Sequence, residues 1–125
     1  NNKLKNKKIT FLGVTFKPNT DDMRDASSLP MISYLNKKNC KISYYDPSGE
    51  KNEFKSMKNV KYCDTASKAC LKADLIILHT EWNDFKLLNF KKLVRKNNFK
   101  VFDMRNLYSP SKMKKLNIKY FGVGR

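Results

Sequence analysis

The chain has 125 residues, of which 40% are hydrophobic and 30% are charged. This length and balance are typical of one globular domain with a hydrophobic core, and they exclude an intrinsically disordered segment. No apolar run approaches the roughly 20 residues that a membrane-spanning helix needs.

The formal net charge of +16 admits two interpretations. A basic patch that neutralises phosphates would bind nucleic acid in a salt-dependent manner. However, only four residues are arginine, and the lysines are dispersed along the chain, often beside asparagine. We therefore favour a solvated lysine surface, and keep a basic nucleic-acid-binding module as the alternative.

Cysteine and histidine are scarce. The three cysteines, Cys40, Cys63 and Cys70, show no C-x-x-C spacing, and His79 is the single histidine. This usage predicts a reducing compartment, the cytoplasm, without a disulfide framework. A metal site would need an unusual set of ligands, so we predict none.

The first predicted elements follow a polar, lysine-rich lead-in at 1–8 that suggests a fragment of a longer protein. The apolar run from Ile9 to Val14 predicts a strand that is buried on both faces. After a polar loop, Ser27 or Ser28 is placed to cap a helix at about 29–38. A strand, a loop and a helix start in this order predict the βα crossover of an α/β fold.

The rest of the chain continues this alternation. In order, we predict strands at 40–45 and 60–63, a helix at 65–73, a strand at 74–80, a helix at 89–96, a strand at 99–102, a helix at 109–115 and a strand at 118–123. The segment DLIILHT at 74–80 is the clearest strand and should lie at the sheet centre. The pattern predicts a single Rossmann-like α/β domain, a three-layer sandwich with a mainly parallel sheet of five or six strands.

The loop after the first strand carries the most informative charges. Lys17 is a cation on a flexible stem, Arg24 is a planar bidentate cation, and Asp21 and Asp22 can hold them in place. A surface loop whose charges pair only with one another is an equally good interpretation of these residue types.

Polar clusters also follow other predicted strands, and Arg105 belongs to one of them. Because parallel strands end at the same edge of a sheet, Lys17 and Arg105 should face one crevice, and two such cations suit a diphosphate. The chain contains no G-x-G-x-x-G and no G-x-x-x-x-G-K-[ST]. We therefore exclude a self-sufficient dinucleotide site and a P-loop.

Five motifs in order resemble one known family. They are GVTFKPNTDDMRDAS at 13–27, YDP at 45–47, ADLIILHTEWNDF at 73–85, DMRN at 103–106 and YFGVGR at 120–125. The chain resembles the C-terminal, UDP-binding domain of the UDP-glucose/GDP-mannose dehydrogenase family, most closely the UDP-glucose 6-dehydrogenase type.

The resemblance implies an enzyme that oxidises UDP-glucose to UDP-glucuronate with NAD. In this family an N-terminal domain binds NAD and a central region carries the catalytic cysteine and the main dimer contacts. No catalytic residue is therefore expected in this chain, and the complete protein should be a dimer or a higher oligomer. Another nucleotide sugar, of the UDP-N-acetylmannosamine or GDP-mannose type, remains an alternative substrate.

The resemblance also implies roles for individual residues. Phe16, Lys17 and Arg105 match positions that contact the UDP-sugar. Arg24 matches an arginine that reaches the NAD of the other domain, while Asp21 and Asp22 should support the loop.

Other polar or aromatic residues are expected to have structural roles. Ser27 stands where many relatives have proline, which should loosen the start of the helix. His79 is expected to be packed or hydrogen-bonded, Trp82 to pack a crevice wall or a domain interface, and the three cysteines to be buried thiols.

Overall fold

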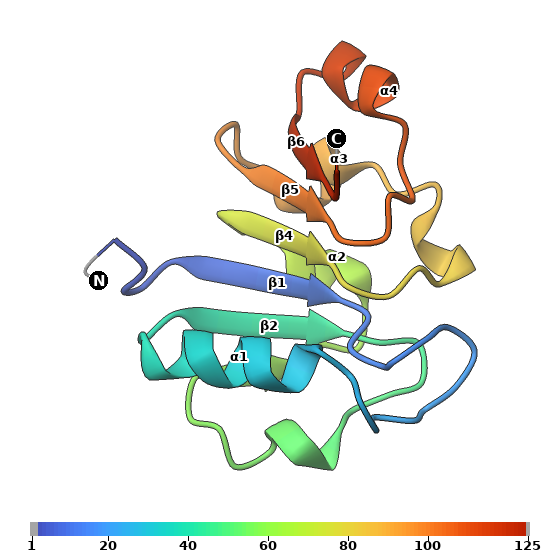
Figure 1. Cartoon of the computed structure of the whole chain (residues 1–125). Coiled ribbons are helices and arrows are strands. Elements are labelled where there is room, and N and C mark those ends of the chain that lie inside the picture. The colour runs from blue at the N-terminus through green and yellow to red at the C-terminus, as the bar shows by residue number, and fades with distance from the viewer. Residues whose placement is uncertain (1–2, 125) are drawn as a thin grey trace.

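The computed structural model describes residues 3–124, and six parallel strands form its single sheet (Figure 1). The strands are β1 (Lys8–Leu12), β2 (Lys41–Tyr45), β3 (Val60–Tyr62), β4 (Leu75–Leu78), β5 (Lys100–Asp103) and β6 (Lys119–Gly122). Their order in the sheet is β3-β2-β1-β4-β5-β6, and every neighbouring pair is parallel. The predicted α/β fold is confirmed, with a sheet that is wholly rather than mainly parallel.

Strands β1 and β4 occupy the sheet centre, as their continuous apolar sequences predict. Ile9 of β1 pairs with Ile42 of β2 on one side and Leu75 of β4 on the other. From β1 the chain adds β2 and β3 on one side of the sheet, and then returns to add β4, β5 and β6 on the other. The strand order therefore reverses between β1 and β4. Ligands of open α/β sheets bind at such a switch point.

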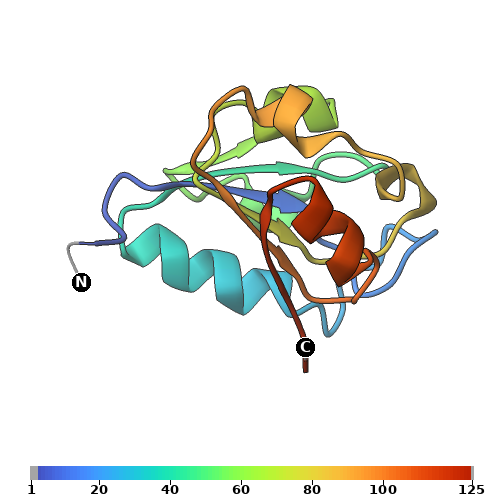
Figure 2. The ribbon, with the colours of Figure 1, turned by 90° about the horizontal axis from the view of Figure 1, so that it is seen from above.

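The helices cover both faces of the sheet. They are α1 (Ser28–Lys37), α2 (Ala66–Cys70), α3 (Phe90–Val94), α4 (Pro110–Lys115) and the short 3-10 helices η1 (Asn52–Phe54) and η2 (Asn83–Phe85). Figure 2 shows α1 on one side of the sheet and α2 and α3 on the other. One core beneath α1 includes Phe11, Ile32 and Ile77, and a second core on the opposite face includes Leu78, Phe90 and Val101.

Three of the short helices begin at side-chain caps of the expected kind. Thr65, Asn89 and Ser109 each accept a hydrogen bond from the backbone N–H three residues further on. Helix α3 ends two residues earlier than predicted, because Arg95 adopts the left-handed conformation with φ 56°. Helix α2 ends at Cys70 rather than residue 73, since the chain must turn there to enter β4.

The start of α1 corrects the prediction of a serine cap. Ser27 occupies the cap position, but its hydroxyl makes no capping hydrogen bond. It contacts His79 instead, and the hydroxyl of Ser28 donates to the carbonyl of Val14 at 2.6 Å. Both serines therefore attach the helix start to the ends of neighbouring strands.

Strand β1 is shorter than predicted at its carboxyl end. It begins at Lys8, within the expected lead-in, and ends at Leu12 because Gly13 has a φ of +77°. A Cβ at Gly13 would lie 2.6 Å from the Cβ of Thr80. Glycine thus permits both the turn and the close approach of the loop to the end of β4. No helix among residues 3–124 is long and apolar enough to cross a membrane.

Candidate functional site

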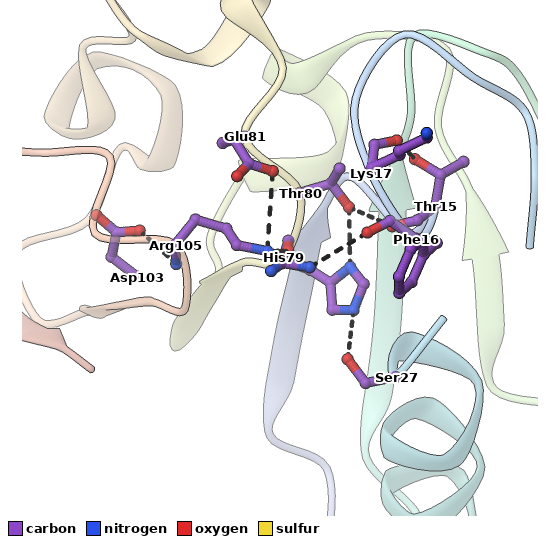
Figure 3. A network of polar contacts seen from close by, with 9 residues as sticks. All are labelled: Thr15, Phe16, Lys17, Ser27, His79, Thr80, Glu81, Asp103 and Arg105. Atoms are coloured by element: carbon purple, nitrogen blue, oxygen red, sulfur yellow. Dashed lines mark hydrogen bonds and ion pairs between the residues drawn. The ribbon is translucent and has the colours of Figure 1, made fainter. Parts of the chain in front are cut away.

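Polar residues gather at the carboxyl edge of the four adjacent strands β2, β1, β4 and β5. The loop after β1 contributes Thr15, Phe16 and Lys17, the end of β4 is followed by His79, Thr80 and Glu81, and β5 ends in Asp103 and is followed by Arg105. Figure 3 shows these segments converging around Arg105 and His79. This edge includes the switch point between β1 and β4.

Arg105 connects two of these segments. Its Nε donates to the carbonyl of His79 at 2.9 Å, and its Nη2 donates to the carbonyl of Phe16 at 3.3 Å. These bonds use two of the five N–H groups of a guanidinium. The side chain keeps 35% of its surface exposed, so the remaining donors can reach an anionic ligand.

Two carboxylates orient the Arg105 segment. Asp103 is fully buried, and its Oδ1 accepts the Arg105 backbone N–H at 3.1 Å. The Oε1 of Glu81 lies 3.8 Å from the Arg105 Nε, with both side chains about one third exposed or more. An ion pair of that length and exposure stabilises little, so Glu81 leaves Arg105 available for a ligand.

Phe16 and Lys17 lie on the exposed surface of the loop. The hydroxyl of Thr15 donates to the Lys17 carbonyl at 2.9 Å, and the Phe16 residue is 48% exposed. In Figure 3 the Lys17 ammonium points away from Arg105. The structure therefore brings the carbonyl of Phe16 to Arg105, while the Lys17 side chain extends outward.

Arg24 is held by a bidentate carboxylate on the same loop. Its Nε and Nη2 donate to Asp22 at 3.0 and 2.9 Å, and the Arg24 backbone N–H donates to Asp22 Oδ1. The side-chain hydrogen bond from Arg24 and then the backbone bond lower the pKa of Asp22 to about 2. The Arg24 side chain is 89% exposed and, with Asp21, lines an open hollow of about 400 Å³.

A second, buried network lies behind Arg105. His79 is fully buried; its Nε2 lies 2.9 Å from the Ser27 hydroxyl and its Nδ1 lies 2.9 Å from the Thr80 hydroxyl. Thr80 in turn donates to the carbonyl of Thr15 at 2.8 Å. Burial, and then the charge of Arg105, lower the pKa of His79 to about 4, so its imidazole is neutral at pH 7.

Asp46 supports the loop from the β2 side. Its buried carboxylate accepts the backbone N–H of Val14 at 2.8 Å and that of Ser48 at 2.9 Å. These bonds join the first residues beyond β1 and β2 at the edge where the candidate site lies. The motif YDP marked this position in the sequence, but did not indicate that its aspartate contacts the β1 loop.

The described residues contain no obvious reactive centre. All three cysteines are buried, as predicted, and burial raises the pKa of Cys40 and raises that of Cys70 to about 12. Such thiols are poor nucleophiles. Within residues 3–124 no three His, Cys, Asp or Glu side chains are grouped to hold a metal ion.

Trp82 is buried in the hydrophobic core that also includes Phe85, and its place on a crevice wall or a domain interface stays a prediction. The contacts that the sequence did not reveal are those of Ser27, His79, Thr80 and Asp46. Each is a polar residue at or just beyond a strand end or helix start, which marked the region but not the partner.

Comparisons with known proteins identify the family of the chain. Residues 10–110 match the UDP-glucose/GDP-mannose dehydrogenase family, UDP binding domain. The chain is 34% identical over 125 residues to UDP-glucose 6-dehydrogenase of Rhizobium meliloti (strain 1021), covering 98% of this chain and 28% of the relative. It is 36% identical over 124 residues to the enzyme of the same name from Rickettsia felis (strain ATCC VR-1525 / URRWXCal2), covering 97% and 28%.

Solved structures share the fold. NDP-N-acetyl-D-galactosaminuronic acid dehydrogenase from Methanosarcina mazei Go1 superimposes with a TM-score of 0.83 at 24% identity, over 98% of this chain and 26% of that chain. A UDP-glucose dehydrogenase from Pyrobaculum islandicum gives a TM-score of 0.74 at 21% identity, over 95% and 26%.

The chain thus spans little more than a quarter of the length of these relatives. The matched residues 10–110 include Arg105 and both segments that it contacts, the β1 loop and the end of β4. The chain belongs to the UDP-glucose/GDP-mannose dehydrogenase family, in which it corresponds to the UDP binding domain.

Proposed function

We propose that the chain binds the nucleotide of UDP-glucose as the C-terminal domain of an NAD-dependent UDP-glucose 6-dehydrogenase. The observation that carries the proposal is Arg105: a partly exposed guanidinium at the switch-point edge, fixed by two backbone carbonyls and retaining further N–H donors. Relatives named UDP-glucose 6-dehydrogenase match nearly the whole chain, which favours this sugar over the other nucleotide sugars of the family.

The residue roles are those that the family resemblance implies, and position and charge support them. Arg105 would bind the diphosphate with its free N–H groups, Lys17 would add a mobile ammonium, and Phe16 would contact the nucleotide sugar with its exposed ring. Asp21 and Asp22 would support the loop, and Asp22 already fixes the orientation of Arg24.

Arg24 is the residue of this chain that we assign to NAD. Arg24 is exposed and pre-oriented toward the outside of the loop, as an arginine reaching a cofactor on another domain would be. The 125 residues hold no G-x-G-x-x-G for the cofactor pyrophosphate. Bound NAD accepts the hydride in this chemistry. We therefore assign its main site, the catalytic cysteine and the dimer contacts to other domains of a cytoplasmic homodimer or higher oligomer.

Calorimetric titration of the 125-residue chain with UDP tests the proposal. We expect weak binding, and a loss of roughly tenfold to a hundredfold in affinity for Lys17→Ala or Arg105→Ala, because each removes a charge-assisted contact. Lys115→Ala, an exposed lysine on α4, is the control for general attraction to a chain of charge +16. Equal losses for Lys115→Ala and Lys17→Ala would contradict the assignment.

A further inference from the structure

His79 is a fully buried polar side chain at a junction of three segments. It follows β4, contacts the start of α1 through Ser27, and contacts the loop after β1 through Thr80 (Figure 3). The roles proposed above for Arg105, Lys17 and Phe16 use none of these three side chains. A buried polar group with two side-chain partners nevertheless specifies the geometry around it.

Counting donors determines the tautomer of His79. The Thr80 hydroxyl has one proton, which it donates to the Thr15 carbonyl at 2.8 Å. Its oxygen must therefore accept from His79, so Nδ1 carries the ring proton and Nε2 accepts from the Ser27 hydroxyl. Every polar atom in this chain of hydrogen bonds then has a partner.

The chain of hydrogen bonds ends next to the proposed ligand contacts. Thr15 directly precedes Phe16, whose carbonyl accepts from Arg105, and the Thr15 hydroxyl caps the Lys17 carbonyl. The carbonyl of His79 itself accepts from Arg105. His79 therefore holds the loop after β1 in place through its ring, and orients Arg105 through its backbone carbonyl.

We propose that His79 is a positioning residue for UDP, holding the Thr15–Lys17 segment through Thr80 so that Lys17 and Arg105 meet the diphosphate. The inference rests on the proposed function. The imidazole does not contact the ligand, because it is buried and both ring nitrogens are engaged with Ser27 and Thr80.

Two near-isosteric variants separate the two ring nitrogens. The amide nitrogen of His79→Asn can replace Nδ1 as donor to Thr80, whereas His79→Gln can replace only the acceptor toward Ser27. We expect His79→Asn to keep the UDP affinity within about threefold, and His79→Gln and His79→Leu to weaken it about tenfold. An affinity for His79→Leu equal to that of the parent chain, in a folded variant, overturns the proposal.

A double-mutant cycle distinguishes positioning from general loss of stability. If the His79 ring acts through the loop that carries Lys17, His79→Leu should weaken UDP binding about threefold or less once Lys17 is alanine. An undiminished tenfold loss in that background overturns the proposal. Thr10→Val is the control, since Thr10 is equally buried and donates to the Ala69 carbonyl; it should lower the melting temperature without changing UDP affinity.

The outcomes also separate the two proposals. A parent chain that does not bind UDP contradicts the proposed function itself. A parent chain that binds UDP through Lys17 and Arg105, with His79→Leu binding equally well, contradicts only the role of His79. Circular dichroism and thermal melting of each variant establish that the comparison is made between folded proteins.

Discussion

At the scale of single residues, the carboxyl edge depends on close approach and on buried polar partners. Gly13 allows the β1 loop to touch the end of β4, and His79 links that contact to the helix start. Both positions tolerate little change. Gly13 has no space for a Cβ, and the His79 side chain is buried away from solvent.

Replacing Gly13 should destabilise the fold measurably. Gly13→Ala forces an L side chain into a positive φ and places its Cβ against Thr80. We therefore expect the free energy of unfolding to fall by about 2–4 kcal/mol. Gly49→Ala is the matched control, because Gly49 also has a positive φ but no atom within 4 Å of the added Cβ. Gly49→Ala should lower the free energy of unfolding, measured in urea, by about 1 kcal/mol. Equal losses would show that contact with Thr80 is unimportant.

The pH dependence of stability should carry the signature of His79. Its folded-state pKa of about 4 lies below the ordinary 6.5, because burial and Arg105 disfavour the charged ring while Asp46 and the Gly13 backbone favour it. As the pH falls below 6.5, the unfolded chain binds the proton before the folded chain does. The contribution of His79 to the free energy of unfolding is therefore complete above pH 6.5 and decreases as the pH falls to about 4.

Between pH 7 and pH 5 this difference in proton binding should lower the free energy of unfolding by about 2 kcal/mol. Urea unfolding at the two pH values should show the loss in the parent chain and not in His79→Asn. The comparison is clean because His79 is the only histidine. Asp22, with its pKa of about 2, titrates below this window. A loss in His79→Asn as large as in the parent chain would show that another group is responsible.

At the scale of elements, β5 and β6 are joined by one buried carboxylate. Asp103 ends β5, and its Oδ2 accepts from the Tyr108 backbone N–H at 2.9 Å and from the Tyr120 hydroxyl of β6 at 2.8 Å. Because its Oδ1 also accepts from Arg105, the edge of the sheet and the candidate site share this side chain.

Asp103→Leu should therefore affect both stability and binding. The substitution leaves the backbone N–H groups of Arg105 and Tyr108 and the Tyr120 hydroxyl without this acceptor. We expect the free energy of unfolding, measured by heat or urea, to fall by about 3 kcal/mol. Tyr120→Phe removes one of these bonds and should lose about 1 kcal/mol. If Asp103→Leu unfolds like the parent chain, the carboxylate does not hold β5 to β6.

At the scale of the whole molecule, the candidate site lies at one edge of the sheet, and the residues that form it include none of the three cysteines of the chain. The cysteines are buried, and the described residues include no metal-binding cluster. The relatives that the chain matches are more than three times longer. Under the proposed function, the chemistry on the sugar is assigned to groups outside this chain.

The isolated 125-residue chain should show no NAD reduction with UDP-glucose. The physical reason is that no exposed thiol and no pyrophosphate-binding glycine loop occurs in it. Absorbance at the wavelength of reduced NAD, with a complete UDP-glucose 6-dehydrogenase as positive control, measures the rate. Turnover by the purified chain would mean that the active centre lies within these residues.

The sequence by itself predicted the order of the strands and main helices and the edge at which the candidate site lies. Local signals suffice for this: apolar runs identify buried strands, Thr65 and Asn89 identify helix starts, and alternation with helices makes the strands parallel. Parallel strands end at one edge, so Lys17 and Arg105 had to follow strands that end together. The ordered motifs were sufficient for the family.

Only the tertiary structure decided which side chains meet at that edge. Ser27 contacts His79 across 52 residues, and Phe16 contacts Arg105 across 89. Such pairs depend on strand order, register and the path of the loops, which no local pattern encodes. For the same reason the serine that resembles a helix cap in sequence is a partner of the buried histidine in the fold: its hydroxyl can make either bond, and packing selects one.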